Sequence, residues 1–320
     1  MDLKVDDDDQ IIQIPLIDFT KGHQDLEEGS DGWKNLCDQV RQACEEYGCF
    51  QVVYSKISVE LCEEMFKSSK ELFDLPDETK MKNTGSKPYN GYIGKIDVVP
   101  LYESLGIEDV LNLEAVQAFV QLMWPDGNSV FCEIVNSMTK KMYELNLTIL
   151  KLLMESYGVE KYYSSHVDNS DIIFRAMKYK APNSNDSEIG LQPHVDKSCL
   201  SILCQDSVQG LEVLSREGNW FRVAPLPGAF TVFIGDALKA WSNGRLHGVK
   251  HRVMMNGDKE RYSFGLFSSP KEGLMIEVPD ELVDKEHPLL FRSFNYTDFL
   301  HYYYSHIDDG NELEVYAGVV

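Results

Sequence analysis

Three His-x-Asp triplets combine side-chain types that bind transition metals. They are His166-Val-Asp168, His194-Val-Asp196 and His306-Ile-Asp308. On a β-strand, residues i and i+2 point to the same face, so an imidazole and a carboxylate with this spacing can reach one ion. Two histidines and one carboxylate on one side of a metal form the facial triad of non-haem iron(II) oxygenases, which leaves coordination positions open for O₂ and a co-substrate.

The sequence around each triplet indicates which of the three is the best candidate for a metal site. His306-Ile-Asp308 has no histidine after it, and His166-Val-Asp168 lies in the polar stretch SSHVDNSD, which is typical of a loop. His194-Val-Asp196 precedes the strand-like run CLSILC, and a later strand-like run brings a second histidine. That histidine is either His247 or His251, because residues four apart on a strand also share a face. The alternative interpretation of His194 and Asp196 is a polar strand end.

A second chemical signal follows in the run RYSFGLF, where Arg261 and Ser263 share one face of a predicted strand. An arginine in an apolar strand is unfavourable unless its charge is paired. One interpretation is an ion pair with a protein carboxylate. The other is a clamp for a dicarboxylic acid, because the planar guanidinium donates two parallel hydrogen bonds to a carboxylate.

These residues lie in a half of the chain that has the pattern of β-structure. After about residue 171, short runs rich in Val, Ile, Phe and Tyr alternate with turn residues, which predicts a sandwich or barrel of the jelly-roll kind. The predicted strands are IIFRAMKYK, CLSILC, GLEVL, NWFRVAP, AFTVFIG, KHRVMM and RYSFGLFSS. A covering helix is expected at Tyr296–His306.

The first half is mainly helical. Apolar residues at three- and four-residue steps predict helices, and short apolar runs predict two strands. The helices are expected from about 32 to 48, at Val59–Phe73 and at Ser129–Tyr157, and the strands at Ile11–Phe19 and Cys49–Tyr54. Residues 83–106 are expected to form an ordered loop region with short strands. We expect a single domain, in which residues 1–170 form a supporting region and residues 171–320 form the jelly-roll catalytic core with its C-terminal helix.

Composition excludes several classes of protein. The net charge of −22 disfavours nucleic-acid binding, which relies on Lys and Arg. The sequence contains no apolar run of about 18 residues, so a membrane span is not expected. Seven cysteines, an odd number without a Cys-x-x-Cys motif, argue against a disulfide framework and a thiolate zinc site. The opening MDLKVDDDDQ lacks the features of a leader peptide, so the expected location is cytoplasmic.

Taken together, the motifs resemble those of the plant 2-oxoglutarate/Fe(II)-dependent dioxygenases. The resemblance rests on His194-x-Asp196, His251-Arg-Val and Arg261-x-Ser263, and extends along almost the whole chain through IPLIDF, ACEEYGCFQVV and ELFDLP. The family fold is a double-stranded β-helix, or jelly roll: a mostly β core with supporting α-helices. KPYNGYIG, YESLGIED and MWPDGN are similar to the subgroup of glucosinolate side-chain dioxygenases and steroidal-glycoalkaloid hydroxylases, and less closely to auxin oxidases.

The resemblance implies a role for each matching residue. His194, Asp196 and His251 would bind Fe(II), which favours His251 over His247. Arg261 and Ser263 would bind the distal carboxylate of 2-oxoglutarate. Tyr179 would add a hydrogen bond to the same co-substrate, although Met177, Lys180 and Ala181 depart from the family's Asn-Tyr-Tyr-Pro-Pro pattern around it.

The implied reaction oxidises a C–H bond of a small plant specialised metabolite, most simply by hydroxylation, with O₂ as oxidant and with succinate and CO₂ as co-products. Ascorbate would help to keep the iron reduced, and the enzyme would act as a monomer. An iron oxygenase that does not use 2-oxoglutarate and a catalytically silent small-molecule binding protein are the alternatives. Tyr102, Phe174 and Phe267 are candidate pocket walls, with ordinary core burial as the alternative for each, and Lys87–Gly94 is a candidate lid.

Overall fold

The computed structural model describes residues 14–20, 27–87, 90–94, 96–182, 188–306 and 311–319. The acidic run Asp6–Asp9, the start of the strand expected at Ile11–Phe19, and Asp308 of the third triplet lie outside these residues. Within the described ranges, no helix is both long and apolar enough to cross a membrane.

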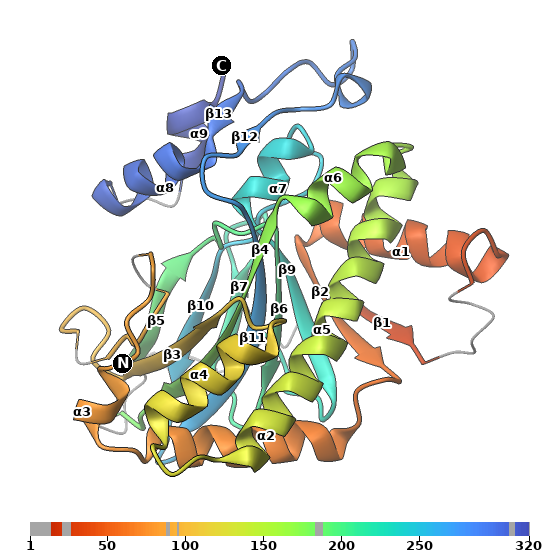
Figure 1. Ribbon diagram of the computed structural model, residues 1–320. Coiled ribbons are helices and arrows are strands. Elements are labelled where there is room, and N and C mark those ends of the chain that lie inside the picture. The colour runs from red at the N-terminus through yellow and green to blue at the C-terminus, as the bar shows by residue number, and fades with distance from the viewer. Residues whose placement is uncertain are drawn as a thin grey trace, which may run out of the picture.

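Two β-sheets pack face to face and form the core (Figure 1). The larger has seven strands in the order β1-β2-β9-β6-β11-β4-β3, antiparallel except for the β1–β2 pair. Its strands are β1 (Leu16–Phe19), β2 (Cys49–Tyr54), β3 (Tyr102–Glu108), β4 (Ser170–Tyr179), β6 (Leu200–Gln205), β9 (Ala229–Ile234) and β11 (Arg261–Pro270). The smaller sheet has the order β5-β10-β7-β8. Its strands are β5 (Glu188–His194), β7 (Leu211–Leu214), β8 (Trp220–Arg222) and β10 (His251–Met255). This arrangement confirms the predicted jelly roll in a single domain.

Helices cover the outer face of the larger sheet (Figure 1). They are α1 (Asp31–Glu46), α2 (Val59–Phe73), α4 (Leu113–Met123) and α5 (Ser129–Ser156). Alternation along each strand sends one set of side chains to these helices: Phe174 of β4 and Phe264 of β11 are buried in the main hydrophobic cluster together with Met142 and Ile149 of α5. The other set faces the smaller sheet. The larger sheet is therefore buried on both faces, and only its inner face is available for a site.

The remaining elements are short. They comprise α3 (Asp77–Lys80), α6 (Tyr163–Asp168), α7 (Asp236–Trp241), β12 (Met275–Ile276), β13 (Phe294–Asn295), α8 (Tyr296–Ser305), α9 (Glu312–Ala317) and two 3₁₀ turns at Glu160–Tyr162 and Asp280–Leu282. In Figure 1 the C-terminal elements β12, β13, α8 and α9, drawn in blue, lie at one end of the two sheets, beside α7. The boundary expected between residues 170 and 171 falls at the start of β4.

Two elements differ from the sequence-based expectation. Residues 163–168, expected as a loop, form α6. Residues 113–123 form α4, which was not predicted although both of its signals are present. Asn112 caps it by accepting a hydrogen bond from the Glu114 amide at 3.0 Å. Its buried side chains recur at helical spacing, at Val116, Phe119, Val120 and Met123.

Candidate active site

The two histidines of the site face each other across neighbouring strands. β5 and β10 pair antiparallel with His194 opposite His251 in the register, and their ring centroids are 4.3 Å apart. On its other side, His251 stacks on Phe233 of the facing sheet with a centroid distance of 4.4 Å. Strand pairing therefore brings together two residues that are far apart in the sequence, and ring stacking fixes one of them.

Asp196 completes the cluster from a turn. The i, i+2 argument assumed that His194 and Asp196 share a strand, but β5 ends at His194 and Asp196 lies where the chain crosses to the other sheet. Its backbone carbonyl accepts a hydrogen bond from the Asp236 amide at 2.7 Å. Its Oδ1 lies 3.5 Å from His194 Nε2 and 3.8 Å from His251 Nε2. One ligand atom from each of the three residues lies within 4.8 Å of the others, close enough to share one ion.

The ring nitrogens that face away from Asp196 are engaged with backbone carbonyls. His194 Nδ1 lies 2.8 Å from Gln192 O, and His251 Nδ1 lies 3.3 Å from Val249 O. A carbonyl can only accept, so Nδ1 carries a proton in each ring, and in the neutral ring Nε2 keeps its lone pair. Both lone pairs are therefore directed at a carboxylate, an arrangement that is repulsive unless a cation lies between them.

Burial and charge favour the protonation states that bind a metal. Burial lowers the pKa of His251 to about 4, which keeps the ring neutral at neutral pH. Burial also works against ionisation of Asp196, but His251 and His194 in their protonated forms, together with Ser201, outweigh it and hold the pKa of Asp196 below its ordinary value. Oδ2 of Asp196 is buried without a hydrogen-bond partner in the described part of the chain. A neutral His251, an ionised aspartate and an orphaned oxygen fit a divalent metal ion.

The other histidines considered from the sequence lie elsewhere. The backbone amide of His247 donates to Cys44 O at 3.0 Å, at the C-terminal end of α1, and His247 is not part of the cluster. His166 is in α6, where residues i and i+2 point in different directions, so His166 and Asp168 do not share a face. His306 ends α8, where its Nδ1 lies 2.9 Å from Tyr302 O.

Arg261 lies on the inner face of the larger sheet, at the start of β11, and is 2% exposed. Its Nη2 donates to Gln205 Oε1 at 2.9 Å, and its Cζ lies 5.0 Å from the centroid of the Tyr179 ring. Nε and Nη1 are buried and have no hydrogen-bond partner among the described residues. No ion pair with a described carboxylate is found either, which argues against the first interpretation of this arginine. Two free donors on a buried cation call for an anionic partner.

Tyr179 and Ser263 flank Arg261. Tyr179 is the register partner of Arg261 between β4 and β11, and Ser263 follows two residues later on the same face. Gln205 also belongs to this group: it pairs with Ser263 between β6 and β11 and orients the guanidinium. Sequence reasoning missed Gln205, because a glutamine at a strand end carries no signal of its own.

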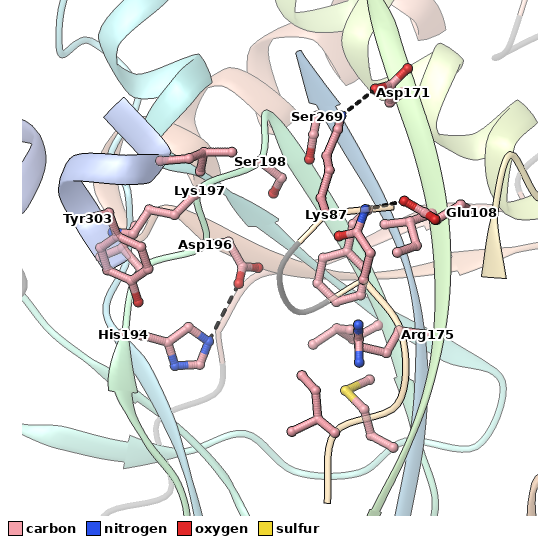
Figure 2. Close-up of a pocket in the computed structure, with 18 of the residues that line it drawn as sticks. Lys87, Glu108, Asp171, Arg175, His194, Asp196, Lys197, Ser198, Ser269 and Tyr303 are labelled. Atoms are coloured by element: carbon pink, nitrogen blue, oxygen red, sulfur yellow. Dashed lines mark hydrogen bonds and ion pairs between the residues drawn. The ribbon is translucent and has the colours of Figure 1, made fainter. Parts of the chain in front are cut away.

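One cavity of about 1280 Å³ joins the metal cluster and the arginine. Tyr102 and Phe267 line it, but Phe174 does not, because it points to the helices. Figure 2 shows Arg175 and Lys87 within this cavity and His194 turned toward Asp196. Arg175, which sequence reasoning also missed, donates to Ser104 Oγ at 2.6 Å. Parts of the Lys87–Gly94 loop line the cavity as well, and Lys87 forms a 3.0 Å ion pair with Asp171.

Comparison with protein families gives two matches. The family described as the 2OG-Fe(II) oxygenase superfamily matches residues 158–270, and the family described as the non-haem dioxygenase in morphine synthesis N-terminal matches residues 14–117. The probable 2-oxoglutarate-dependent dioxygenase AOP1.2 of Arabidopsis thaliana is 44% identical, with 91% of each chain covered. The 2-oxoglutarate-dependent dioxygenase AOP3 of the same species is 31% identical, covering 96% of this chain and 98% of its own.

Solved structures show the same relationship. A rice dioxygenase for auxin oxidation superposes with a TM-score of 0.82 at 34% identity, covering 95% of this chain and 100% of its own. JOX2 in complex with 2OG, Fe and JA superposes with a TM-score of 0.80 at 25% identity, covering 96% of this chain and 90% of its own. The jelly roll, the cluster at its inner face and the likeness along both halves have one explanation: this chain belongs to the 2OG-Fe(II) oxygenase superfamily.

Proposed function

We propose that the protein is an Fe(II)- and 2-oxoglutarate-dependent dioxygenase that hydroxylates a C–H bond of a small plant specialised metabolite. The observation that carries the proposal is the pair of unsatisfied groups in one cavity: Oδ2 of Asp196, and Nε and Nη1 of Arg261. Buried polar atoms without partners are rare in proteins and call for a ligand. A divalent metal satisfies the first group and a dicarboxylate satisfies the second.

In this proposal His194, Asp196 and His251 hold the iron. The two imidazoles offer their Nε2 lone pairs, and the backbone carbonyls of Gln192 and Val249 keep the protons on Nδ1. When bound, the iron, with 2-oxoglutarate and O₂, supplies the oxidising chemistry, and succinate and CO₂ are released. Held by these three residues, the iron would keep coordination positions for the co-substrate.

Arg261, Ser263 and Tyr179 bind the distal carboxylate of 2-oxoglutarate. The guanidinium donates a charge-assisted hydrogen bond to that carboxylate from a nitrogen that has no partner among the described residues, and the Ser263 hydroxyl adds a donor from the same face of β11. Gln205 holds Nη2 and so sets the plane of the guanidinium. Apolar side chains line this part of the cavity and keep water away from the ion pair: Leu191, Leu203, Leu211 and Val253.

The substrate occupies the rest of the cavity. Phe267, Ile173, Leu300 and Tyr303 form its apolar and aromatic walls, and Arg175 provides a polar group within them. Relatives named for auxin oxidation and a relative solved with JA support a small organic molecule as substrate. Residues 1–170 serve in this proposal as the supporting region, and residues 171–320 as the catalytic core.

The experiment that tests the proposal is succinate formation from 2-oxoglutarate. Purified protein with Fe(II), ascorbate and a plant metabolite extract is assayed for succinate, and untargeted profiling identifies the consumed compound and its product. His194→Ala should abolish succinate and product while the protein stays folded, whereas His287→Ala, at the surface, should retain both. Full turnover by His194→Ala would refute the ligand assignment. Product formed without 2-oxoglutarate would instead support an iron oxygenase that uses another reductant.

We also propose that the enzyme acts as a monomer in the cytoplasm and requires ascorbate only to keep its iron reduced. The support for the cytoplasm is that none of the seven cysteines is joined in a disulfide. Light scattering after size-exclusion chromatography measures the oligomeric state, and a dimer would contradict the proposal. Replacing ascorbate by another reductant should preserve turnover.

A further inference from the structure

Lys197, which directly follows Asp196, is a buried lysine that the proposed reaction does not use. Its Nζ lies 2.6 Å from Asp236 Oδ2 and 3.6 Å from Glu312 Oε2. The same Nζ lies 4.1 Å from the centroid of the Tyr303 ring. The side chains are only 10% (Lys197), 4% (Asp236) and 7% (Glu312) exposed. Buried charges are unfavourable unless paired, so each member depends on the others.

The partners of Lys197 come from three helices. Asp236 begins α7, Tyr303 belongs to α8 and Glu312 begins α9. Figure 2 shows Lys197 beside Tyr303, whereas the neighbouring Asp196 turns toward His194. Lys197 is therefore a residue through which the C-terminal helices contact the turn that carries Asp196. The same helices contribute Leu300, Tyr303 and Tyr304 to the cavity wall.

Asp236 holds this turn a second time through its backbone. Its amide donates to Asp196 O at 2.7 Å, next to the ion pair that its side chain forms with Lys197. The preceding Gly235 packs so closely that a Cβ there would lie 2.0 Å from Ser198 O and 2.9 Å from Asp196 O. The backbone on both sides of the Asp196 side chain thus has little freedom to shift.

We propose that Lys197 is a positioning residue of the iron site, which locks the Asp196 turn to α7, α8 and α9. Two carboxylates and an aromatic face hold its ammonium group. That group therefore stays away from Asp196 Oδ2, the one buried carboxylate oxygen next to it that lacks a hydrogen-bond partner within the described ranges. When the charge of Glu312 is removed, the ammonium group is held less firmly. It can then turn toward the Asp196 carboxylate and compete with the metal. The inference rests on the proposed role of Asp196 as an iron ligand.

The test compares two carboxylates of the same helix. Glu312→Gln keeps the size of the side chain and removes the negative charge that faces Lys197. Glu314→Gln is the matched control, because Glu314 pairs with Lys239. This variant weakens a contact between the same helices, α7 and α9, but leaves the partners of Lys197 unchanged. Binding of Co(II) to the metal-free protein is measured by calorimetry, and folding by circular dichroism. We expect the Kd for Co(II) to rise about tenfold in Glu312→Gln, as for outer partners of metal ligands in general, and to stay unchanged in Glu314→Gln.

Hydrogen exchange gives a readout that is independent of metal and turnover. The amides of residues 196–199 should exchange faster in Glu312→Gln than in Glu314→Gln, because the turn has lost one of its restraints. A folded Glu312→Gln protein with the Co(II) affinity and exchange rates of the wild type would overturn the inference. If Glu312→Gln does not fold, Glu312→Asp, which keeps the charge and withdraws it by one methylene, is measured in the same way, and wild-type values would again overturn it.

His194→Ala separates this inference from the proposed function. If His194→Ala binds Co(II) as tightly as the wild type does, the proposed iron ligands are wrong. If His194→Ala loses Co(II) and Glu312→Gln does not, the ligand set stands and only the role of Lys197 fails.

Discussion

The residues of the site keep polar atoms unsatisfied at a cost in folding free energy. Leaving a buried donor or acceptor unpaired costs about 1–3 kcal/mol, and Asp196 and Arg261 together contain three such atoms among the described residues. These groups are held in place by neighbours that do not themselves satisfy them: Gln205 fixes the guanidinium, and backbone carbonyls fix the two imidazoles. The site is therefore arranged for its ligands before they bind.

The guanidinium geometry predicts a large effect of a conservative substitution. Arg261→Lys keeps the positive charge but loses the planar guanidinium that Gln205 orients, so we expect the KM for 2-oxoglutarate to rise at least about tenfold with a smaller change in kcat. Steady-state succinate assays at varied 2-oxoglutarate measure this. Arg222→Lys is the control: Arg222 of β8 forms a partly exposed ion pair with Glu212 of β7, and its substitution should leave the KM unchanged. An unaltered KM in Arg261→Lys would show that the co-substrate is held elsewhere.

His166 predicts a pH dependence of stability that is unrelated to catalysis. Burial lowers its pKa from 6.5 to about 4, and its Nε2 has no partner among the described residues. The unfolded chain therefore binds more protons between these pH values, so the stabilisation is complete above pH 6.5 and is lost as the pH falls to 4. We expect a loss of about 2 kcal/mol, less than the full shift implies because the ring is partly exposed.

His166→Phe tests this assignment, because phenylalanine can keep the edge contact that His166 makes with Trp241. Its unfolding free energy in urea should fall less steeply between pH 6.5 and 4 than that of the wild type. Part of the decrease should remain, since burial also lowers the pKa of His247 and that of His251 to about 4. His287→Gln, at an exposed pair with Asp284, should behave as the wild type does. Identical pH profiles for His166→Phe and the wild type would contradict the assignment.

The elements place these residues by pairing and by close packing. Antiparallel pairing of β5 with β10 aligns the two histidines, and pairing of β4 with β11 aligns Tyr179 with Arg261. α7 has only six residues, yet its first residue holds the Asp196 turn through both its amide and its carboxylate. A small shift of this helix is therefore expected to move the Asp196 side chain relative to the two histidines.

Gly235 is the position at which this packing can be disturbed most simply. Gly235→Ala brings a methyl group within 2.0 Å of Ser198 O, so either α7 or the turn has to move. We expect metal affinity and turnover to fall at least about tenfold and unfolding free energy to fall by 1–3 kcal/mol, about the range for overpacked sites. Calorimetry with Co(II) and urea unfolding measure the two effects.

Gly218→Ala is the control for this variant. A Cβ added at Gly218 would meet no other atom within 4 Å, but the residue has a positive φ of 87°, so alanine there should cost stability, about 1 kcal/mol, without affecting metal binding. Equal metal affinity in both variants would show that α7 does not control the Asp196 turn.

Across the whole molecule, the two halves share one sheet. β1 and β2 extend the larger sheet beyond β9, and β3 covers the opposite edge beside β4. α1, α2 and α5, also from the first half, contribute to the main hydrophobic cluster together with β4, β6, β9 and β11. The supporting region is thus part of the core that the catalytic strands need.

This architecture predicts that residues 171–320 do not fold alone. The fragment would expose the apolar outer face of the larger sheet and leave β4 and β9 as unpaired edges, which favours aggregation. We expect it to be insoluble, or to lack a cooperative urea transition, whereas the full chain unfolds in one transition. A soluble fragment with a cooperative transition that binds Co(II) would disprove this expectation.

The sequence alone determined the chemistry of the site and most of the elements. The spacing of His194, Asp196 and Arg261 and the family resemblance indicated the reaction class, and strand Cys49–Tyr54 and helix Val59–Phe73 were predicted at their observed bounds. These are local properties, because side-chain type and hydrophobic periodicity depend only on residues that are close together in the sequence. α4 was missed although its cap and stripe could have been recognised.

Only the tertiary structure decided which groups meet. Spacing left His247 and His251 equivalent, and it is the register of β5 with β10 that sets His251 opposite His194. The i, i+2 spacing also suggested that Asp196 lies on a strand. In the structure Asp196 lies in a turn where the chain crosses between the sheets, and α7 holds this turn. Gln205 and Glu312 gain their roles from contacts between residues far apart in the chain. Such contacts depend on how strands pair and helices pack, and a single sequence does not encode them in any local pattern.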